Sequence, residues 1–268
     1  VCDVSQDALD RMRADIYPGR YGQWDSAIRL YRNEDAPRGD FDLILVGTPP
    51  EYHIPLAQDA LQESPKGILI EKPLCPPTLE GADELARASE VSDVSIYVGY
   101  EYALCRAARK VEQYLAENAI GTVETLDVEY REHWGGIFAA HPWLDGPEDT
   151  YLGYSDRGGG ASSEQSHALN LWQHFAHLVG GGRVQRVGAS INYVEEGRAR
   201  YDKLCFLNLV TEGPAEVEAK EADAEGSDGP GAGGGYETKD SVDIHSDGPG
   251  AGGGYDSKSL IVVDSDGP

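Results

Sequence analysis

One segment of the chain reads Gly67-Ile68-Leu69-Ile70-Glu71-Lys72-Pro73, and Cys75-Pro76-Pro77 follows it closely. Its three consecutive apolar residues are typical of a parallel strand that is buried on both faces. Such a strand delivers Glu71 and Lys72 to its carboxyl end, which is the edge of an open α/β sheet where ligands bind. The proline restricts Lys72 to extended backbone geometry and permits a cis Lys72–Pro73 bond. The alternative is an exposed strand end followed by a proline-rich loop.

On both sides of this segment, apolar runs alternate with helical patterns. We expect further strands at residues 1–4, 41–47 and 94–99, and helices near 5–15, 25–32, 51–62, 78–89 and 103–118. Because strands and helices alternate with short connections, the predicted fold class is α/β, with a doubly wound parallel sheet over residues 1–120.

Asp3 lies where the second strand of a dinucleotide-binding unit places the carboxylate that holds a ribose. Since no GxGxxG motif occurs near the start of the sequence, the first strand and the glycine loop of such a unit would lie before Val1. Residues 1–120 are thus expected to form an incomplete, Rossmann-like dinucleotide-binding domain. A solvated acid at a strand end is the alternative for Asp3.

After residue 120 the pattern changes to long alternating segments. Residues 122–134, 184–194 and 201–211 are expected to form antiparallel strands with one solvated face, in an α+β substrate domain over 121–224. The long stretch 135–160 is expected to be a functional loop because of its length and aromatic content. A helix over 162–179 follows, in which Glu164 and His167 lie three residues apart on one face.

Residues 225–268 are rich in glycine and contain a repeat. The sequence Ser-Asp-Gly-Pro-Gly-Ala-Gly-Gly-Gly-Tyr occurs at 227–236 and again at 246–255. A segment of this composition buries little apolar surface, so disorder is expected. The short alternating pieces 241–245 and 260–264 could still pair as strands.

The composition indicates a soluble protein whose partners are small molecules. The net charge is −25, from 47 acidic and 22 basic residues, so nucleic acids and anionic membranes are repelled. No apolar run approaches the roughly 20 residues of a membrane span, and the scattered cysteines form no CxxC pair, so a cytoplasmic location is expected. So acidic a chain is also expected to be halophilic, because salt screens its self-repulsion.

Four motifs occur in the order and spacing of a known family. They are Thr48-Pro49-Pro50-x-x-His53, Glu71-Lys72-Pro73, Val98-Gly99-Tyr100 before a long helix that ends at Ile120-Gly121, and Gly158-Gly159-Gly160 before Glu164-x-x-His167. Over residues 1–211 the chain resembles the glucose-fructose oxidoreductase and inositol dehydrogenase (Gfo/Idh/MocA) family, with both ends expected to be truncated.

The resemblance implies a fold, an activity and a mode of association. It implies an N-terminal Rossmann domain and a C-terminal α/β domain on a large, mostly antiparallel sheet. The implied activity is hydride transfer between NAD(P) and a sugar or polyol hydroxyl. Self-association as a homo-oligomer would use the open face of the C-terminal sheet.

The resemblance also assigns roles to single residues. Lys72 is similar to the family's active-site lysine and His167 to its acid–base histidine, and Glu164 occupies a position where an aspartate usually orients that histidine. An imidazole suits this role, since oxidation of a carbinol requires a base for the hydroxyl proton. The residues expected to bind the cofactor, NAD rather than NADP, are Asp3, Thr48, Pro49, His53, Glu71 and Lys72. Those expected to face the substrate are Tyr100, Trp143 and Arg157.

The same residues admit other interpretations. His167 alone would be an ordinary helix histidine, Trp172 is most simply a core residue, and Glu164, His167 and His174 could form a metal face. The spacing lacks the HExxH pattern, so no metal is expected. The alternative functions are a carbohydrate-binding or interaction homologue that has lost cofactor binding, and an NAD-dependent lyase or glycosidase. The sequence identifies neither the substrate nor the direction of reaction.

Overall fold

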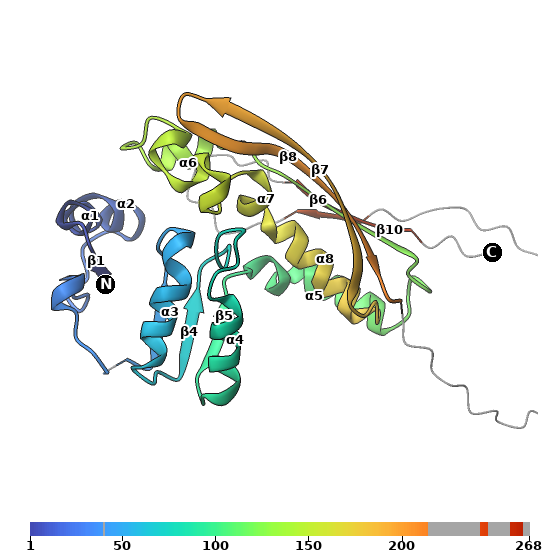
Figure 1. The fold of residues 1–268 in the computed structure, drawn as a ribbon, viewed down its shortest axis with the longest axis horizontal. Helices are drawn as coiled ribbons and strands as arrows, with labels where there is room; N and C mark the ends of the chain where they lie inside the picture. Colours follow the sequence, from blue (N-terminus) through green and yellow to red (C-terminus); the bar gives the residue numbers. More distant parts are fainter. Residues whose placement is uncertain (40, 214–241, 246–257, 265–268) are drawn as a thin grey trace, which may run out of the picture.

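The computed structural model describes residues 1–39, 41–213, 242–245 and 258–264 (Figure 1). A small parallel sheet with its helices forms the N-terminal part, and long antiparallel strands form the C-terminal part. Within the described residues no helix is long and apolar enough to cross a membrane. The predicted α/β class is confirmed, with a parallel sheet followed by antiparallel sheets.

The N-terminal part is built on a parallel sheet with the order β3-β4-β5. Its strands are β3 (Leu43–Val46), β4 (Gly67–Ile70) and β5 (Ser95–Val98). Strand β4 lies in the centre, and its residues Ile68 and Ile70 are fully buried, as the apolar run predicts. All three strands run in the same direction, so their carboxyl ends meet at one edge of the sheet.

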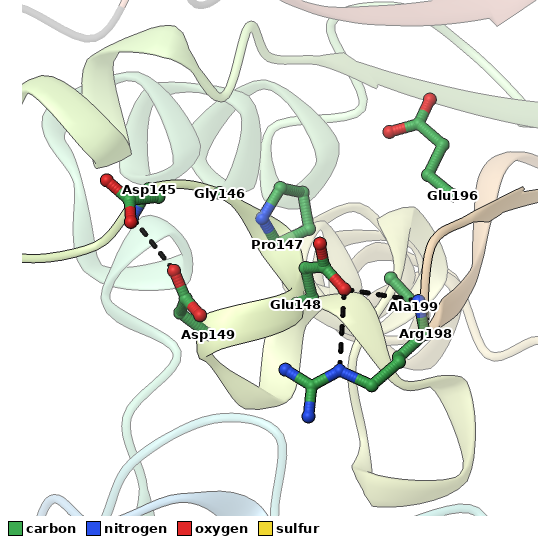
Figure 2. A pocket seen from close by; sticks show the side chains of 8 residues that line it. All are labelled: Asp145, Gly146, Pro147, Glu148, Asp149, Glu196, Arg198 and Ala199. Atoms are coloured by element: carbon green, nitrogen blue, oxygen red, sulfur yellow. Dashed lines mark hydrogen bonds and ion pairs between the residues drawn. The ribbon is translucent and has the colours of Figure 1, made fainter.

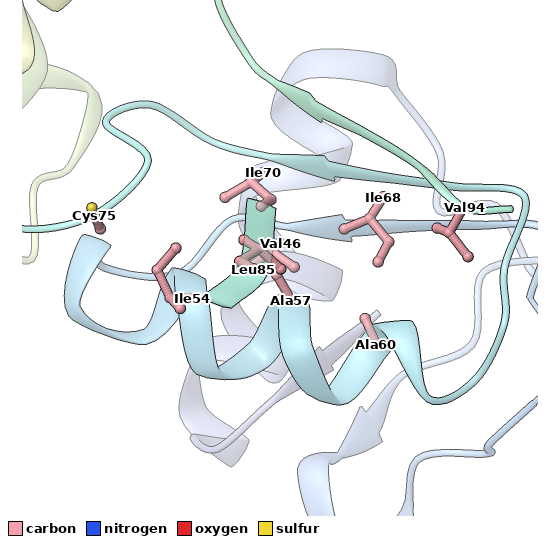
Figure 3. Close-up of a cluster of buried hydrophobic side chains, with 9 residues drawn as sticks. All are labelled: Val46, Ile54, Ala57, Ala60, Ile68, Ile70, Cys75, Leu85 and Val94. Atoms are coloured by element: carbon pink, nitrogen blue, oxygen red, sulfur yellow. The ribbon is translucent and has the colours of Figure 1, made fainter. Parts of the chain in front are cut away.

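A cluster of buried side chains fixes two helices to this sheet (Figure 3). They are α3 (His53–Leu61), which follows the 3-10 turn η3 (Pro50–Tyr52), and α4 (Ala82–Val91). Each buried aliphatic side chain contributes about 1.5–3 kcal/mol through removal of its surface from water. The cluster comprises Val46, Ile54, Ala57, Ala60, Ile68, Ile70, Cys75, Leu85 and Val94.

Strand β1 (Cys2–Asp3) lies outside the β3-β4-β5 sheet. It pairs in parallel with β2 (Tyr31–Arg32), in a separate sheet of two strands. The strand of Asp3 was expected in the same parallel sheet as the strand that ends at Lys72, and this expectation is wrong. The physical reason is the strand order, because a Rossmann sheet places a further strand between the positions of β1 and β3.

The segment between β1 and β2 is helical only in its first half. Ser5 caps α1 (Gln6–Arg11), and its Oγ accepts a hydrogen bond from the Ala8 amide at 3.3 Å. The helix continues as the π-helical turn η1 (Met12–Ile16) and as α2 (Tyr17–Tyr21). The helix expected at 25–32 is not formed, because Asp25 closes a local turn onto the Ala27 amide at 2.8 Å. The 3-10 turn η2 (Asn33–Asp35) follows β2.

The C-terminal part contains two antiparallel sheets. One has the order β6-β10-β9, from β6 (Thr125–Arg131), β10 (Lys258–Asp264) and β9 (Val242–His245). The other is the long hairpin of β7 (Val184–Glu196) and β8 (Ala199–Thr211). The predicted antiparallel strands are present. Of the two short pieces of the tail, β10 pairs with β6, and β9 pairs with β10. The remainder of the tail, with its expected disorder, lies outside the described residues.

A second buried cluster joins two helices to β6. These are α5 (Arg106–Ala116), which follows the 3-10 turn η4 (Glu101–Leu104), and α8 (Ser166–Leu178). Val111, Leu171 and Phe175 form its centre. The segment 135–160 is more regular than expected. It contains α6 (Gly135–Ala140) and the 3-10 turns η5 (Pro147–Asp149), η6 (Tyr151–Gly153) and η7 (Ser155–Arg157).

Candidate active site

An ion pair joins the carboxyl end of β4 to the C-terminal part. The Nζ atom of Lys72 lies 2.8 Å from Oε1 of Glu164 and donates to the Glu164 backbone carbonyl at 3.2 Å. The Lys72–Pro73 peptide bond is cis, as the sequence permits. The two side chains are only 14% and 15% exposed, so the ammonium is held in one position by a charge-assisted contact.

Glu164 and His167 do not share a helical face. Helix α7 (Ala161–Glu164) ends before α8 begins, and Gln165 between them has φ −94° and ψ 23°. The continuous helix expected over 162–179 is thus broken, and a spacing of three residues no longer brings the two side chains together. Glu164 instead binds Lys72 and accepts a hydrogen bond from the Tyr151 hydroxyl at 3.4 Å.

His167 is enclosed by three tyrosine rings and is only 6% exposed. Its ring centroid lies 5.8 Å from that of Tyr100, 4.6 Å from that of Tyr102 and 6.1 Å from that of Tyr130. The hydroxyls of Tyr102 and Tyr130 are hydrogen-bonded to each other at 2.9 Å. Nδ1 of His167 has no partner among the described residues, and Nε2 lies 3.9 Å from Oε1 of Glu101.

Burial determines the protonation of this cluster. Burial and, secondly, the charge of Lys72 lower the pKa of His167 from 6.5 to about 4. The imidazole is therefore neutral near pH 7 and carries a free lone pair. Burial also raises the pKa of Tyr130 and of Tyr151 well above the usual value, so both phenols keep their protons.

Two further carboxylates, Glu101 and Glu132, belong to this site and were not singled out from the sequence. Desolvation raises the pKa of both carboxyls, although it is only partial at Glu101, whose side chain is 69% exposed. Negative neighbours add to the effect, namely Glu71 and Glu164 at Glu101, and Glu164 at Glu132. The Gln165 amide donates to Glu132. Glu101 follows β5 closely, as Glu71 follows β4, so the strand-end pattern was a signal that could have revealed it.

His53 lies beneath the sheet edge rather than on its surface. It is fully buried, with Nδ1 2.8 Å from the Pro73 carbonyl and Nε2 2.6 Å from the Thr48 carbonyl. The imidazole thus connects the loop after β3 to the loop after β4. A side chain whose two ring nitrogens are both hydrogen-bonded to the backbone has no free polar atom for a ligand. His53 was expected to contact the cofactor, but in the structure it holds the loops that carry Thr48 and Pro73.

The residues present fit one end of a dinucleotide. Thr48 and Glu71 are exposed at the same edge as Lys72, and Pro49 lies beside Thr48. A Cβ atom on Gly99 would lie 3.3 Å from Oε2 of Glu71, so the glycine makes room for this carboxylate. These side chains suit the nicotinamide ribose, but residues 1–120 contain no GxGxxG loop for the pyrophosphate. Asp3 lies on the separate β1-β2 sheet, where its Oδ1 accepts from the Ser5 amide at 2.7 Å.

The three residues expected to face a substrate are separated in the structure. Tyr100 packs against His167. The Nε atom of Arg157 donates to Glu51 at 2.8 Å, which fixes η7 to η3. Trp143 contacts His141 and the guanidinium of Arg11, which lies 4.3 Å from the indole ring. Tyr100 is thus the one member of the three that contacts the His167 cluster.

His174, a residue of the alternative metal face, and Trp172, expected in the core, both have partners on neighbouring elements. Nε2 of His174 lies 2.7 Å from Oε1 of Glu112, and the Trp172 indole donates to the Leu126 carbonyl at 3.0 Å. Both side chains thus link α8 to its neighbours. Over the part of the chain that the structure describes, no group of three or more His, Cys, Asp or Glu residues is placed to hold a metal ion.

A separate hollow of about 330 Å³ opens on the C-terminal part (Figure 2). The Oε2 atom of Glu148 accepts from the Arg198 amide at 3.1 Å, and the Asp149 carboxylate accepts from the Asp145 amide at 2.9 Å. Its carboxylates therefore stabilise the loop that carries them. The hollow shares no residue with the Lys72–His167 cluster. It is lined by Asp145, Gly146, Pro147, Glu148, Asp149, Glu196, Arg198 and Ala199.

The fold and the site together define an arrangement in which Lys72 follows the central strand of a parallel sheet, and its charge lowers the pKa of His167 on helix α8. Residues 23–100 match the Gfo/Idh/MocA family model, described as "Oxidoreductase family, NAD-binding Rossmann fold". This match confirms, over residues 23–100, the resemblance to that family noted from the motifs. A sequence comparison with the curated proteins gives no match.

Solved dehydrogenases share the fold. The WlbA dehydrogenase from Bordetella pertussis, in complex with NADH and UDP-GlcNAcA, has a TM-score of 0.59 at 18% identity, over 80% of this chain and 56% of that one. A probable dehydrogenase from Thermotoga maritima has a TM-score of 0.56 at 19% identity, over 80% and 58%. A putative myo-inositol dehydrogenase from Sinorhizobium meliloti 1021 has a TM-score of 0.56 at 18% identity, over 80% and 58%. The chain thus spans little more than half the length of these structures.

Proposed function

We propose that this chain carries the reacting end of an NAD(P)-dependent dehydrogenase that oxidises or reduces a hydroxyl carbon of a sugar or polyol. The observation that carries the proposal is the cluster at the carboxyl edge of β4, where the buried His167 imidazole lies within the influence of the Lys72 charge. The family match over residues 23–100 supports the nicotinamide cofactor. NAD is preferred to NADP because an acid at the end of β1, Asp3, suits a free ribose hydroxyl.

The cofactor, when bound, supplies the hydride acceptor or donor. Thr48, Glu71 and Lys72 would hold its nicotinamide ribose at the sheet edge. Lys72 also orients the substrate hydroxyl, since its ammonium is fixed by Glu164 at 2.8 Å.

His167 receives the hydroxyl proton. Its neutral imidazole carries a lone pair, and Nδ1 has no partner among the described residues. Glu101 lies 3.9 Å from Nε2, and its side chain is 69% exposed, so it connects the buried imidazole to solvent. The tyrosine rings exclude water from the imidazole.

The test is turnover of NAD⁺ with a panel of polyols and sugars, followed by absorbance of the reduced nicotinamide. Replacement of His167 by Gln should lower kcat by roughly 10²–10⁴-fold, because the proton acceptor is lost. The control is His177→Gln, at an exposed position of the same helix. Equal turnover in the two variants would refute the role of His167.

The turnover assay, combined with a binding measurement, also tests the alternative that the protein is a non-catalytic, carbohydrate-binding homologue. A chain that binds a sugar but neither binds NAD⁺ nor turns it over would be a carbohydrate-binding homologue.

A further inference from the structure

The candidate site contains more carboxylates than cations. Glu164 already neutralises Lys72, and the charges of Glu71 and Glu164 act on Glu101, as that of Glu164 acts on Glu132. Within the described part of the chain, Lys72 is the one positive charge that lowers the pKa of Glu101 and of Glu132. His167 adds no charge near pH 7, because burial lowers its pKa to about 4. The cluster is therefore net negative.

Two further features of the cluster point to a ligand. His167 is 6% exposed, and its buried Nδ1 atom has no hydrogen-bond partner among the described residues. A buried nitrogen of this kind costs free energy unless a ligand group satisfies it. The rings of Tyr100, Tyr102 and Tyr130 surround the imidazole. Aromatic faces attract cations and the C–H surface of a sugar ring, and carboxylates attract cations.

We propose that this site selects a polyhydroxylated substrate that carries a protonated amino group, and that Glu101 and Glu132 are the residues that determine this specificity. The inference deepens the proposed function and rests on it for the identity of the reacting hydroxyl. A hydroxyl of the substrate hydrogen-bonds to His167, and its ammonium lies among the carboxylates. A substrate with a carboxylate or phosphate meets like charges with no free cation to offset them, and is rejected.

The probes are glucosamine, glucose and glucuronate, which share one ring and differ in charge. Binding to the full chain is measured by tryptophan fluorescence or NMR near pH 6.5 in low salt, where the amine is protonated. Glucosamine should bind about ten-fold more tightly than glucose, and glucuronate more weakly than either. The preference should shrink in molar KCl, because salt screens the carboxylates.

Two variants and a matched control assign the preference to its residues. Glu101→Gln and Glu132→Gln should each lower the ratio of glucosamine to glucose affinity about three-fold or more. Glu90→Gln, at an exposed position of α4, should leave the ratio unchanged. Glu132 accepts a hydrogen bond from the Gln165 side chain, so Glu132→Gln could destabilise the fold. The Glu101 side chain is exposed, so Glu101→Gln tests the charge preference without this complication.

Several results would overturn the inference. These are no measurable binding of glucosamine, glucuronate affinity equal to that of glucosamine, or an unchanged ratio in Glu101→Gln. Failure of the proposed function is separate from these. Charge-selective binding without any turnover of NAD⁺ would refute hydride transfer and leave the selectivity standing. Turnover of glucuronate as fast as glucosamine would refute the selectivity and leave hydride transfer standing.

Discussion

At the residue scale, the burial of His167 makes the free energy of unfolding depend on pH. The unfolded chain binds a proton at this histidine with a pKa near 6.5, whereas burial lowers the pKa in the folded chain to about 4. Between these values the unfolded state binds more protons, so the free energy of unfolding falls as the pH falls. The contribution is fully present above about pH 6.5.

We therefore expect His167→Gln to flatten the pH dependence of unfolding between about pH 4 and 6.5. The slope should decrease by at most about 1.4 kcal/mol per pH unit, the value for one proton. Urea denaturation at a series of pH values measures this slope. His177→Gln, which alters an exposed histidine of α8, should keep the original slope. An unchanged slope in His167→Gln would show that the imidazole titrates normally.

The Lys72–Glu164 pair gives a second prediction at this scale. Glu164→Gln removes the carboxylate and leaves a largely buried ammonium with one carbonyl partner. The free energy of unfolding should fall by about 1–3 kcal/mol, because the lost partner no longer offsets the desolvation of Lys72. Chemical denaturation measures the loss. The double variant Lys72→Met with Glu164→Gln should recover part of it, and a change below about 0.5 kcal/mol in Glu164→Gln alone would contradict the prediction.

At the scale of elements, the turn before α7 is closed by a buried acid that the sequence did not reveal. Asp202 of β8 is 2% exposed, and its Oδ2 accepts from the Ser162 amide at 2.6 Å, at the start of α7. Gly160 passes so close that a Cβ atom would lie 1.9 Å from Oδ1 of Asp202. Its φ of +93° also disfavours any other residue. The position of α7, and with it that of Glu164, depends on this contact.

Gly160→Ala should accordingly destabilise the chain by about 2–4 kcal/mol, through a steric clash and a strained φ. The thermal midpoint and the urea midpoint both report the change. Gly146→Ala is the matched control, because Gly146 has extended backbone geometry and open space around its Cα atom. Similar stability of the two variants would mean that β8 does not hold the turn.

At the scale of the whole molecule, charge is the dominant global feature. The chain carries a net charge of −25, and this self-repulsion opposes the compact state until counterions screen it. The thermal midpoint should therefore rise with KCl into the molar range. Sodium chloride should have a similar effect, since screening depends on ionic strength. A flat or falling midpoint would remove the argument for adaptation to high salt.

The sequence by itself determined the parallel sheet and the place of Lys72. Ile68 and Ile70 bury one face of β4, and Leu69 places an apolar side chain on the other face. A charged pair and a proline end the strand, so local chemistry alone places Lys72 at the carboxyl edge. The alternating burial of β6 followed from an equally local pattern, whereas β7, expected to have one solvated face, is exposed along nearly its whole length.

The tertiary structure alone decided which charges meet. The break at Gln165 turns Glu164 toward Lys72, and no local pattern in the sequence marks it. The Asp202 contact joins positions 40 residues apart, and the His167–Glu101 approach joins η4 to α8. Such pairings depend on the packing of elements that are distant in the sequence. A charge is buried at low cost in free energy only where the folded chain places an opposite charge or a hydrogen-bond partner beside it.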